Sequence, residues 1–294
     1  MTPEVAKKIT LQDYKENSIK PQWCPSCGDF AVLKCLKDAL VKLQIDPHDL
    51  VMTAGIGCSG RIWAFLNGHS FHGAHGRALP VATGIKLANE RMKVIALGGD
   101  GDGYAIGMGH FIHAIRRNVD ITYIVMDNQD YGLTKGQVSP TSALGYKTTT
   151  TPQGNIEAPI DPILLALASG VSFIARGFSG NPNHLTELMA KAIAHKGFAL
   201  MEIISPCPVF NRVNTYEWYR DQITYLEEDP TYDPTNLSLA LQRMANPDDK
   251  IPLGVIYQVE RPTYEDLRPG RNGLPVVEQP ITGIDYSGLL QEFF

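Results

Sequence analysis

The sequence predicts an α/β fold, with a doubly wound, mostly parallel sheet that carries helices on both faces. Two observations support this prediction. Short apolar runs alternate with helical patterns between residues 51 and 205, and glycine-rich loops follow some of these runs. Strands that alternate with helices form right-handed βαβ units, whose parallel sheet is covered on both faces. A chain of 294 residues is also long enough to bury a large core.

The predicted elements follow one another in a regular order. A β-rich run at 51–55 precedes a helical pattern at 77–90. Continuously apolar runs, which are typical of buried parallel strands, then alternate with further helices. The expected order is strand 93–99, helix 104–117, strand 121–128, helix 161–169, strand 173–177, helix 182–196 and strand 199–205. Pro182 suits the first turn of its helix, because a backbone N–H is not needed there.

The pattern changes after residue 207. Residues 208–294 are rich in Pro, Tyr, Asp and Asn, with only short periodic pieces at 236–244 and 251–258. We therefore divide the chain into an α/β domain, 1–207, and a C-terminal extension, 208–294. The extension is expected to be an irregular arm that packs on the core or on a partner. A partly disordered tail is the alternative.

Composition excludes several classes of protein. The formal net charge of -5 is not that of a nucleic-acid-binding chain. We expect no membrane association, because no apolar run is long enough to span a bilayer. The polar first twenty residues lack the apolar stretch of a secretory signal. An odd number of cysteines, five, argues against a disulfide framework. The sequence thus favours a soluble, cytoplasmic protein whose cysteines bind metal or take part in catalysis.

Four residues that can bind a metal or a cofactor lie at the ends of predicted strands. Cys58, Asp100 and Cys207 lie just beyond strand ends, and Asn128 closes the strand at 121–128. In an open parallel sheet the ligand site forms beyond the carboxyl ends of the strands. These four residues are therefore expected to meet at one edge of the sheet.

A glycine-rich loop with an embedded carboxylate follows the strand at 93–99. Its glycines, at 98, 99, 101 and 103, let the backbone approach a phosphate, and Asp100 offers a hard oxygen to Mg²⁺. The 25 residues 102–126 leave room for one helix and one strand that bring Asn128 back beside Asp100. A dinucleotide-binding loop is the less favoured alternative, because its glycine register fails at Tyr104. A plain tight turn is the second alternative, but it would not explain why Asn128 follows at the sequence spacing that a shared magnesium site requires.

The cysteines suggest a metal centre at the same edge. Cys24 and Cys27 form a C-x₂-C pair, and with Cys58 and Cys207 they make a four-thiolate set. Such a set suits either a [4Fe–4S] cluster or a structural zinc ion. A position at the catalytic edge favours the redox cluster, since electron transfer requires a short distance. Cys35 lies within a helical pattern and is expected to be a packing residue.

Several motifs together resemble the β subunit of 2-oxoacid:ferredoxin oxidoreductases, most closely the two-subunit group that oxidises 2-oxoglutarate. The resemblance is strong over roughly residues 18–215 and weak in the tail. The motifs are WCPSCGDF (23–30), GIGCSGR (55–61), HGRALPVATG (75–84), GDGDGYAIGMGH (99–110), RRN (116–118), DNQDYGLTKGQVSPTS (127–142) and SPCP (205–208).

The resemblance implies thiamine diphosphate, Mg²⁺ and a [4Fe–4S] cluster as cofactors. It implies that the side chains of Asp100 and Asn128 and the backbone carbonyl of Asp130 bind Mg²⁺. The family pattern favours a more apolar residue than Asp at 130, but only the carbonyl is needed. The residues expected to contact the thiamine cofactor are Gly57, Cys58, Ser59, His75, Gly99, Asp100, Gly101, Asp102, Asn128, Leu133 and Thr134.

Two further residues are assigned catalytic roles. His75 is expected to form a hydrogen bond with the diphosphate region of the cofactor, as the similar family histidine does. Arg61 follows the Cys58 loop, and its guanidinium could hold the substrate carboxylate through two hydrogen bonds. An exposed surface arginine is the alternative for Arg61. For Leu133 and Thr134 the alternative is a simple loop role.

The implied reaction is the oxidative decarboxylation of a 2-oxoacid. Electrons would pass through the cluster to ferredoxin, coenzyme A would take the acyl group, and the reverse reaction would fix CO₂. A larger α subunit would supply the pyrimidine-binding domain and its glutamate, and two αβ pairs would form a symmetric (αβ)₂ assembly. Pyruvate or a broad range of 2-oxoacids is the alternative substrate. A non-redox thiamine decarboxylase with structural zinc and a zinc-stabilised binding module are less favoured functions.

Overall fold

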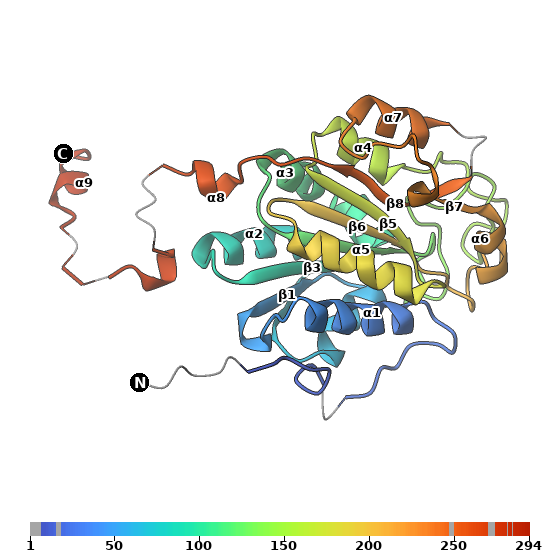
Figure 1. Ribbon diagram of the computed structural model, residues 1–294, viewed down its shortest axis with the longest axis horizontal. Coiled ribbons are helices and arrows are strands. Elements are labelled where there is room, and N and C mark those ends of the chain that lie inside the picture. The colour runs from blue at the N-terminus through green and yellow to red at the C-terminus, as the bar shows by residue number, and fades with distance from the viewer. Residues whose placement is uncertain (1–6, 16–18, 247–249, 270–273, 281, 284) are drawn as a thin grey trace.

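The computed structural model describes residues 7–15, 19–246, 250–269, 274–280, 282–283 and 285–294. Within these residues eight strands form one sheet in the order β2-β1-β3-β4-β6-β5-β8-β7 (Figure 1). The strands are β1 (Leu50–Ala54), β2 (His69–His72), β3 (Lys93–Gly99), β4 (Thr122–Asp127), β5 (Phe173–Phe178), β6 (Ala199–Ile204), β7 (Ile223–Tyr225) and β8 (Ile251–Gln258).

The sheet is mostly parallel, as the sequence predicts. All neighbouring strands run parallel except β5 and β8, which pair antiparallel. Every residue of β1 and β6 is buried, which explains why these strands are mostly apolar; Glu202 of β6 is the charged exception, and it pairs with Arg176 of β5. Strand β2 differs, because all four of its residues are exposed at the sheet edge. Its sequence HSFH carries no buried-strand pattern, so sequence analysis does not predict it.

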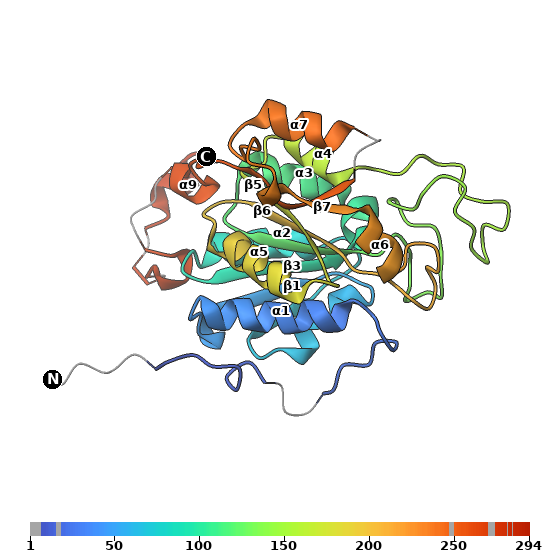
Figure 2. The same ribbon diagram turned by 45° about the vertical axis from the view of Figure 1, so that its right-hand side comes forward.

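Helices cover both faces of the sheet. The longer helices are α1 (Asp29–Lys42), α2 (Ala78–Ala88), α3 (Met108–Arg117), α4 (Pro162–Ala168), α5 (Pro182–Ala194), α6 (Tyr216–Gln222) and α7 (Leu237–Ala245). Helices α1 and α5 pack on one face, and α2, α3, α4 and α7 pack on the other (Figures 1 and 2). Among the described residues two large cores result, one on each side of the sheet, and a smaller cluster forms around Phe178, Ile204, Tyr219 and Leu253. This doubly wound arrangement confirms the predicted fold class.

Local chemistry sets where the helices begin. Asp161 accepts hydrogen bonds from two backbone N–H groups of the first turn of α4, and Asn181 caps α5 by accepting from His184 N. A proline follows each cap, at the position that needs no N–H. The helix predicted at 104–117 is wrong at its start. There the chain forms a π-helical turn, Asp102–Ile106, and α3 begins only after Gly107.

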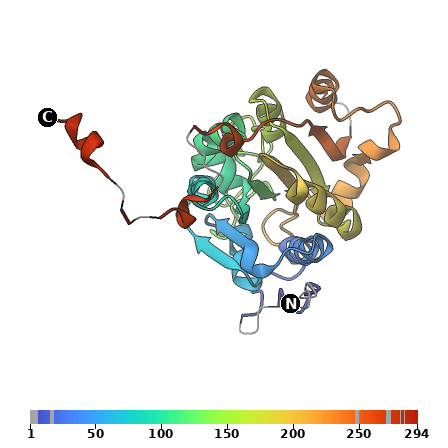
Figure 3. The same ribbon diagram turned by 60° about the vertical axis from the view of Figure 1, so that its left-hand side comes forward.

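The C-terminal segment contributes to the sheet before it leaves the body. The periodic piece at 251–258 is strand β8, and the piece at 236–244 largely coincides with α7. A short helix, α8 (Tyr264–Leu267), follows, and the last helix, α9 (Ser287–Gln291), lies apart from the sheet (Figure 3). The boundary at residue 207 stays a prediction. In the part of the chain described, no helix is both long and apolar enough to cross a membrane.

Candidate active site

Residues predicted to bind metal or cofactor lie at the carboxyl ends of four parallel strands. Loops that follow β1, β3, β4 and β6 contain Cys58, Asp100, Asn128 and Cys207, respectively. Because these strands are neighbours and run in the same direction, their loops gather at one edge of the sheet. The structure therefore brings together residues that lie far apart in sequence.

Asp100 begins the turn after β3 and is buried. Its Oδ2 accepts a hydrogen bond from Thr141 Oγ1 at 2.7 Å, and the same hydroxyl lies 2.8 Å from Asp127 Oδ1. Burial raises the pKa of Asp100 to about 6 and, together with the charge of Asp100, that of Asp127 to about 7. A buried carboxylate and a half-buried one that share a single hydroxyl form an acidic site, which suits a cation.

Asn128 and Asp130 lie on the turn that follows β4. Asn128 Oδ1 accepts from Asp130 N at 3.0 Å, and the carbonyl of Asn128 accepts from Asn211 Nδ2 at 3.1 Å. The carbonyl of Asp130 accepts from Gly132 N at 3.1 Å. The amide oxygen of Asn128, the carbonyl of Asp130 and the carboxylate of Asp100 are all hard oxygen donors. The donor set therefore fits Mg²⁺.

The carboxyl group of Asp130 is a feature that the sequence does not anticipate. Asp130 is 3% exposed, and neither of its side-chain oxygens has a hydrogen-bond partner. Burial raises its pKa to about 6. A Cβ atom on Gly132 would lie 3.8 Å from Asp130 Oδ2, 3.4 Å from Cys207 Sγ and 3.9 Å from Cys58 Sγ. The carboxyl group thus lies beside two of the predicted cluster ligands.

Two glycines of the loops differ in what surrounds them. Gly57 has a φ of 137°, which favours glycine, and a Cβ there would meet nothing within 4 Å. At Gly101 a Cβ would lie 2.1 Å from the ring of Tyr131, whose hydroxyl donates to the carbonyl of Gly101 at 3.1 Å. Gly57 therefore offers open space, whereas Gly101 lets Tyr131 close over the loop.

The side chain of Asp102 forms hydrogen bonds with three groups of the protein. Its Oδ1 accepts from Ile56 N at 2.9 Å, from Gly76 N at 2.8 Å and from His75 Nδ1 at 2.7 Å. These bonds join the glycine-rich loop to the loop that contains Cys58 and to the turn that contains His75. In the geometry described, the side chain of Asp102 therefore holds neighbouring loops together, and its predicted cofactor contact stays a prediction.

The remaining predicted cofactor residues differ in their surroundings. Ser59 is buried, and its hydroxyl lies 3.4 Å from both carboxylate oxygens of Asp29. Leu133 is 50% exposed. Thr134 Oγ1 donates to Gln137 Oε1 at 2.7 Å. A Cβ on Gly99 would lie 3.6 Å from Ser59 Oγ, which places these two loops side by side.

Three chain segments bring the predicted cluster cysteines together. Cys24 and Cys27 lie on a tight turn in which Cys27 N donates to the carbonyl of Cys24 at 3.1 Å. Trp23 Nε1 donates to the carbonyl of Cys58 at 2.8 Å. Gly28 N donates to the carbonyl of Pro206, the neighbour of Cys207, at 3.3 Å. The C-x₂-C turn is therefore tied to both of the other cysteine loops.

Burial and a nearby carboxylate shift the pKa of these thiols in the same direction. Burial raises the pKa of Cys27, Cys58 and Cys207, and that of Cys58 reaches about 11. The charge of Asp29 adds to this rise for Cys27 and Cys58. A metal that coordinates a thiol removes its proton, so a bound metal centre would reverse this trend. Among the described residues, no three His, Cys, Asp or Glu side chains form a group that could hold a single metal ion.

Asp29 is a site residue that sequence analysis misses. It is 1% exposed, and its carboxylate accepts from Ser205 Oγ at 3.1 Å as well as from Ser59 Oγ. Burial raises its pKa to about 6. Asp29 thus links the start of α1 to the loops that hold Cys58 and Cys207. An acidic residue in the first turn of a helix is ordinary in sequence, which is why it gives no signal.

Cys35 and Arg61 lie in different surroundings. Cys35 is fully buried within α1, and its thiol lies 3.3 Å from the carbonyl of Pro182 in α5, as expected of a packing residue. Arg61 N donates to the carbonyl of Cys58 at 3.2 Å, and its guanidinium lies 3.4 Å from Gln22 Oε1. Arg61 is close enough to Cys58 for its charge to offset a small part of the rise that burial causes in the pKa of that thiol.

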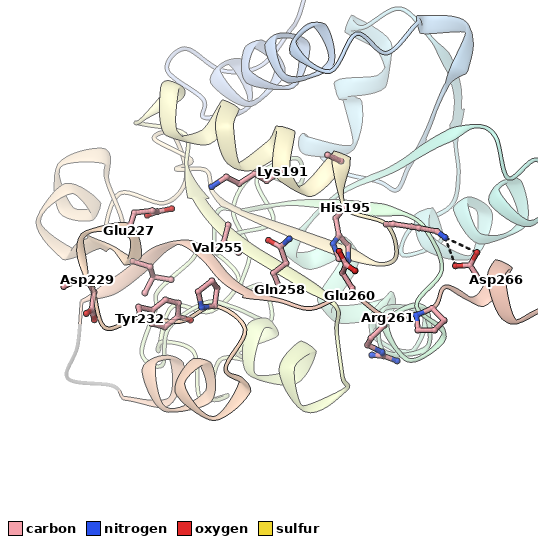
Figure 4. A pocket seen from close by; sticks show the side chains of 16 residues that line it. Lys191, His195, Glu227, Asp229, Tyr232, Val255, Gln258, Glu260, Arg261 and Asp266 are labelled. Carbon is pink, nitrogen blue, oxygen red and sulfur yellow. Dashed lines mark hydrogen bonds and ion pairs between the residues drawn. The ribbon is translucent and has the colours of Figure 1, made fainter.

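A large cavity lies outside this group of residues. It has a volume of about 1150 Å³ and opens between α5 and the segment that precedes α7 (Figure 4). Its lining includes Lys191, His195, Tyr232 and Gln258, and none of the predicted site residues. The candidate site lies instead at the carboxyl ends of β1, β3, β4 and β6.

Two families match consecutive parts of the chain. Residues 55–203 match the family described as thiamine pyrophosphate enzyme, C-terminal TPP binding domain. Residues 207–272 match the family described as the C terminal of the pyruvate ferredoxin oxidoreductase beta subunit. The first match contains the glycine-rich loop and the turn after β4, and the second begins at Cys207.

Related proteins align over most of the chain. The 2-oxoacid:ferredoxin oxidoreductase subunit beta of Saccharolobus solfataricus is 42% identical, over 90% of this chain and 94% of that protein. The 2-oxoglutarate synthase subunit KorB of Methanocaldococcus jannaschii is 37% identical, over 86% and 93%. A solved structure of 2-oxoglutarate:ferredoxin oxidoreductase from Magnetococcus marinus, with 2-oxoglutarate, coenzyme A and succinyl-CoA bound, superposes with a TM-score of 0.85. It is 40% identical and covers 88% of each chain.

Proposed function

Because this chain belongs to the family of 2-oxoacid:ferredoxin oxidoreductase β subunits, we propose that it is the cofactor-binding subunit of an enzyme that oxidises 2-oxoglutarate. The reaction releases CO₂, transfers the remaining acyl group to coenzyme A and passes two electrons, one at a time, to ferredoxin. With reduced ferredoxin in excess, the reverse reaction fixes CO₂. The observation that carries the proposal is the meeting of Asp100, Asn128 and the cysteine loops at one edge of the sheet.

In this proposal thiamine diphosphate, Mg²⁺ and a [4Fe–4S] cluster supply, respectively, the electron sink, the charge neutralisation and the one-electron path. Asp100 and Asn128 hold Mg²⁺ through their side chains, and Asp130 holds it through its carbonyl. Thr141 supports this role, because it fixes one carboxylate oxygen of Asp100. The open backbone at Gly57 leaves space for the cofactor beside Cys58.

Cys24, Cys27, Cys58 and Cys207 are the proposed cluster ligands. The hydrogen bonds that tie their three segments together support this set. Four cysteine thiolates are the usual ligands of a [4Fe–4S] cluster. Because each thiolate in such a cluster binds a different iron, the four sulfur atoms need not converge on a point. Reduced thiols are also expected in the cytoplasm, which is the location we propose.

Arg61 and His75 are the proposed groups for substrate and cofactor. Arg61 follows Cys58, and a guanidinium there can hold a 2-oxoacid carboxylate in two hydrogen bonds. His75 has a partly exposed ring that is anchored through Nδ1, so its second nitrogen is available to a ligand. Leu133 and Thr134 remain proposed cofactor contacts on the turn after β4.

The exposed edge supports a larger α subunit as partner. Exposed apolar side chains lie in the segments that follow β1, β3 and β4, where contact with water is unfavourable for them. They are Ile56, Ile106, Leu133, Leu144 and Ile156. We propose that this edge is covered by the α subunit, which supplies the pyrimidine-binding domain and forms a two-fold symmetric (αβ)₂ assembly with this chain. The extension 208–294 then packs partly on the core and partly on the partner.

The test of the function is an anaerobic assay of the purified αβ complex. Ferredoxin reduction is followed with coenzyme A and a panel that includes 2-oxoglutarate, pyruvate and branched 2-oxoacids. We expect the highest kcat/KM for 2-oxoglutarate, and equal use of several acids would change the substrate assignment. Release of CO₂ from every substrate without reduction of ferredoxin would contradict the redox function.

Iron analysis tests the ligand set separately. Replacement of Cys24, Cys27, Cys58 or Cys207 by Ser is expected to lower the iron content of the complex, because each removes one thiolate. Cys35→Ser is the matched control, since its thiol packs between α1 and α5. Loss of iron in Cys35→Ser together with full iron in one of the other variants would show that the set is wrong.

A further inference from the structure

Asp102 accepts three hydrogen bonds through a single buried oxygen. Its side chain is 1% exposed, and its Oδ2 has no partner. The carboxylate lies against Gly55, where a Cβ would be only 1.9 Å from Oδ2. Gly55 therefore makes the space that Asp102 occupies, and any larger side chain at 55 would displace the carboxylate from its donors.

The two backbone donors to Asp102 Oδ1 decide which nitrogen of the His75 ring carries hydrogen. The backbone N–H groups of Ile56 and Gly76 can only donate, so Asp102 Oδ1 is an acceptor toward both. The same oxygen therefore also accepts from His75, and Nδ1 must carry the hydrogen. Nε2 is left as the ring nitrogen that can meet a ligand.

A second contact holds the imidazole ring from another side. The ring of His75 meets the ring of Tyr131 edge-on, with centroids 6.2 Å apart and an angle of 80° between the planes. Tyr131 lies on the turn after β4 and donates through its hydroxyl to the carbonyl of Gly101. The imidazole is therefore fixed between Asp102 and the turn that carries the proposed magnesium ligands.

We propose that Asp102 is a positioning residue that sets the tautomer and orientation of His75, so that Nε2 faces the diphosphate region of the cofactor. This inference rests on the proposed function and deepens it. Asp102 itself touches neither substrate nor cofactor through its side chain in this role. It acts through His75. Its bonds to Ile56 N and Gly76 N join the loops, and in Asp102→Asn the amide oxygen can still accept both, so the cycle isolates the contact with His75.

A double-mutant cycle on the αβ complex tests the proposal. The variants are Asp102→Asn, which keeps the shape but removes the charge, His75→Ala, and the two combined. The readouts are kcat with 2-oxoglutarate and the Kd of thiamine diphosphate in the presence of Mg²⁺. Each single change is expected to lower kcat and raise Kd about tenfold, as the loss of a residue that orients a ligand group typically does.

The double variant shows whether Asp102 acts through His75 or independently of it. If Asp102 acts through His75, the double variant loses no more than His75→Ala does, to within about twofold. If the losses of the single variants multiply, Asp102 acts independently of His75 and the proposal is overturned. Glu265→Gln is the matched control, because Glu265 is a similarly buried carboxylate that accepts from Asp120 N, before the start of β4. It should leave kcat and Kd unchanged.

A direct measurement covers the case in which Asp102→Asn does not fold. Neutron diffraction from deuterium-exchanged crystals of the wild-type complex locates the hydrogen on the His75 ring. A deuteron on Nδ1, facing Asp102, is the expected result, and a ring deuterated on Nε2 alone would overturn the proposal. Wild-type complex that binds no thiamine diphosphate would instead refute the proposed function, while a deuteron on Nδ1 would still uphold the Asp102–His75 contact.

Discussion

At the residue scale, one hydroxyl group lies between the buried carboxylate of Asp100 and the half-buried carboxylate of Asp127. Thr141 reaches Asp100 and Asp127 from the loop after β4, and Ser139 of the same loop also approaches Asp100. These hydroxyls fix the carboxylate of Asp100 in place. The magnesium affinity of the site should therefore depend on a residue that binds no magnesium.

Replacement of Thr141 tests this dependence. Thr141→Val removes the hydroxyl at constant shape and should weaken Mg²⁺-dependent binding of thiamine diphosphate about tenfold, as changes behind a metal ligand typically do. Thr141→Ser should restore most of the affinity. Thr83→Val, which removes a hydroxyl bonded to a carbonyl within α2, is the control. Calorimetric titration of the complex gives the affinities, and an unchanged affinity in Thr141→Val would show that Asp100 needs no support.

Asp29 is the second residue whose importance only the structure reveals. Asp29→Leu leaves the hydroxyls of Ser59 and Ser205 without their acceptor, and each unpaired buried group costs about 1–3 kcal/mol. We expect a lower free energy of unfolding together with a lower iron content, since the same bonds align the cysteine loops. Asp38→Leu, which breaks an exposed ion pair of α1, should change neither by much. Full iron content in Asp29→Leu would mean that the loops align without it.

At the element scale, the start of α1 is pressed against the end of β6. A Cβ on Gly28 would lie 2.4 Å from Ser205 Oγ and 3.0 Å from Ser205 Cα. Helix and strand therefore approach each other as closely as a glycine allows. This approach brings the turn of Cys27 next to the loop of Cys207.

A pair of glycine substitutions tests how this close approach affects the free energy of unfolding. Gly28→Ala should lower the free energy of unfolding by about 1–3 kcal/mol, because the added methyl overpacks the junction. Its iron content should fall as well. Gly84→Ala in α2 is the matched control, since a Cβ there meets nothing within 4 Å. It should raise stability by about 0.4–1 kcal/mol. Urea unfolding of both variants checks the two signs, and a neutral Gly28→Ala would contradict the close packing.

The sequence predicts some elements well and others poorly for physical reasons. Strands β3, β4 and β6 are largely apolar because both faces of the sheet are covered, so their pattern is visible locally. Strand β8 also shows as a periodic piece, but its antiparallel partner β5 lies far earlier in the chain, so the sequence does not indicate the pairing. The same limit applies to the site. Motif spacing places Asp100 and Asn128 together, but the roles of Asp29 and Thr141 depend on contacts between distant segments.

At the scale of the whole molecule, the described residues form one α/β sheet, and the proposed site lies at the carboxyl ends of its parallel strands. Within the described residues, the proposed diphosphate anchor and the four cysteines both belong to this edge. The apolar side chains around it need a cover, and the activation of a thiamine cofactor needs a second domain that the predicted domain organisation does not include. We therefore infer that this chain is one half of a catalytic unit.

The initial rate of 2-oxoglutarate-dependent ferredoxin reduction tests this claim most directly. It is measured anaerobically with coenzyme A, thiamine diphosphate and Mg²⁺ for this chain alone, for the larger subunit alone and for the two together. Turnover is expected only when both subunits are present. A rate for the isolated chain equal to that of the complex would contradict it, because the whole catalytic machinery would then lie within these 294 residues.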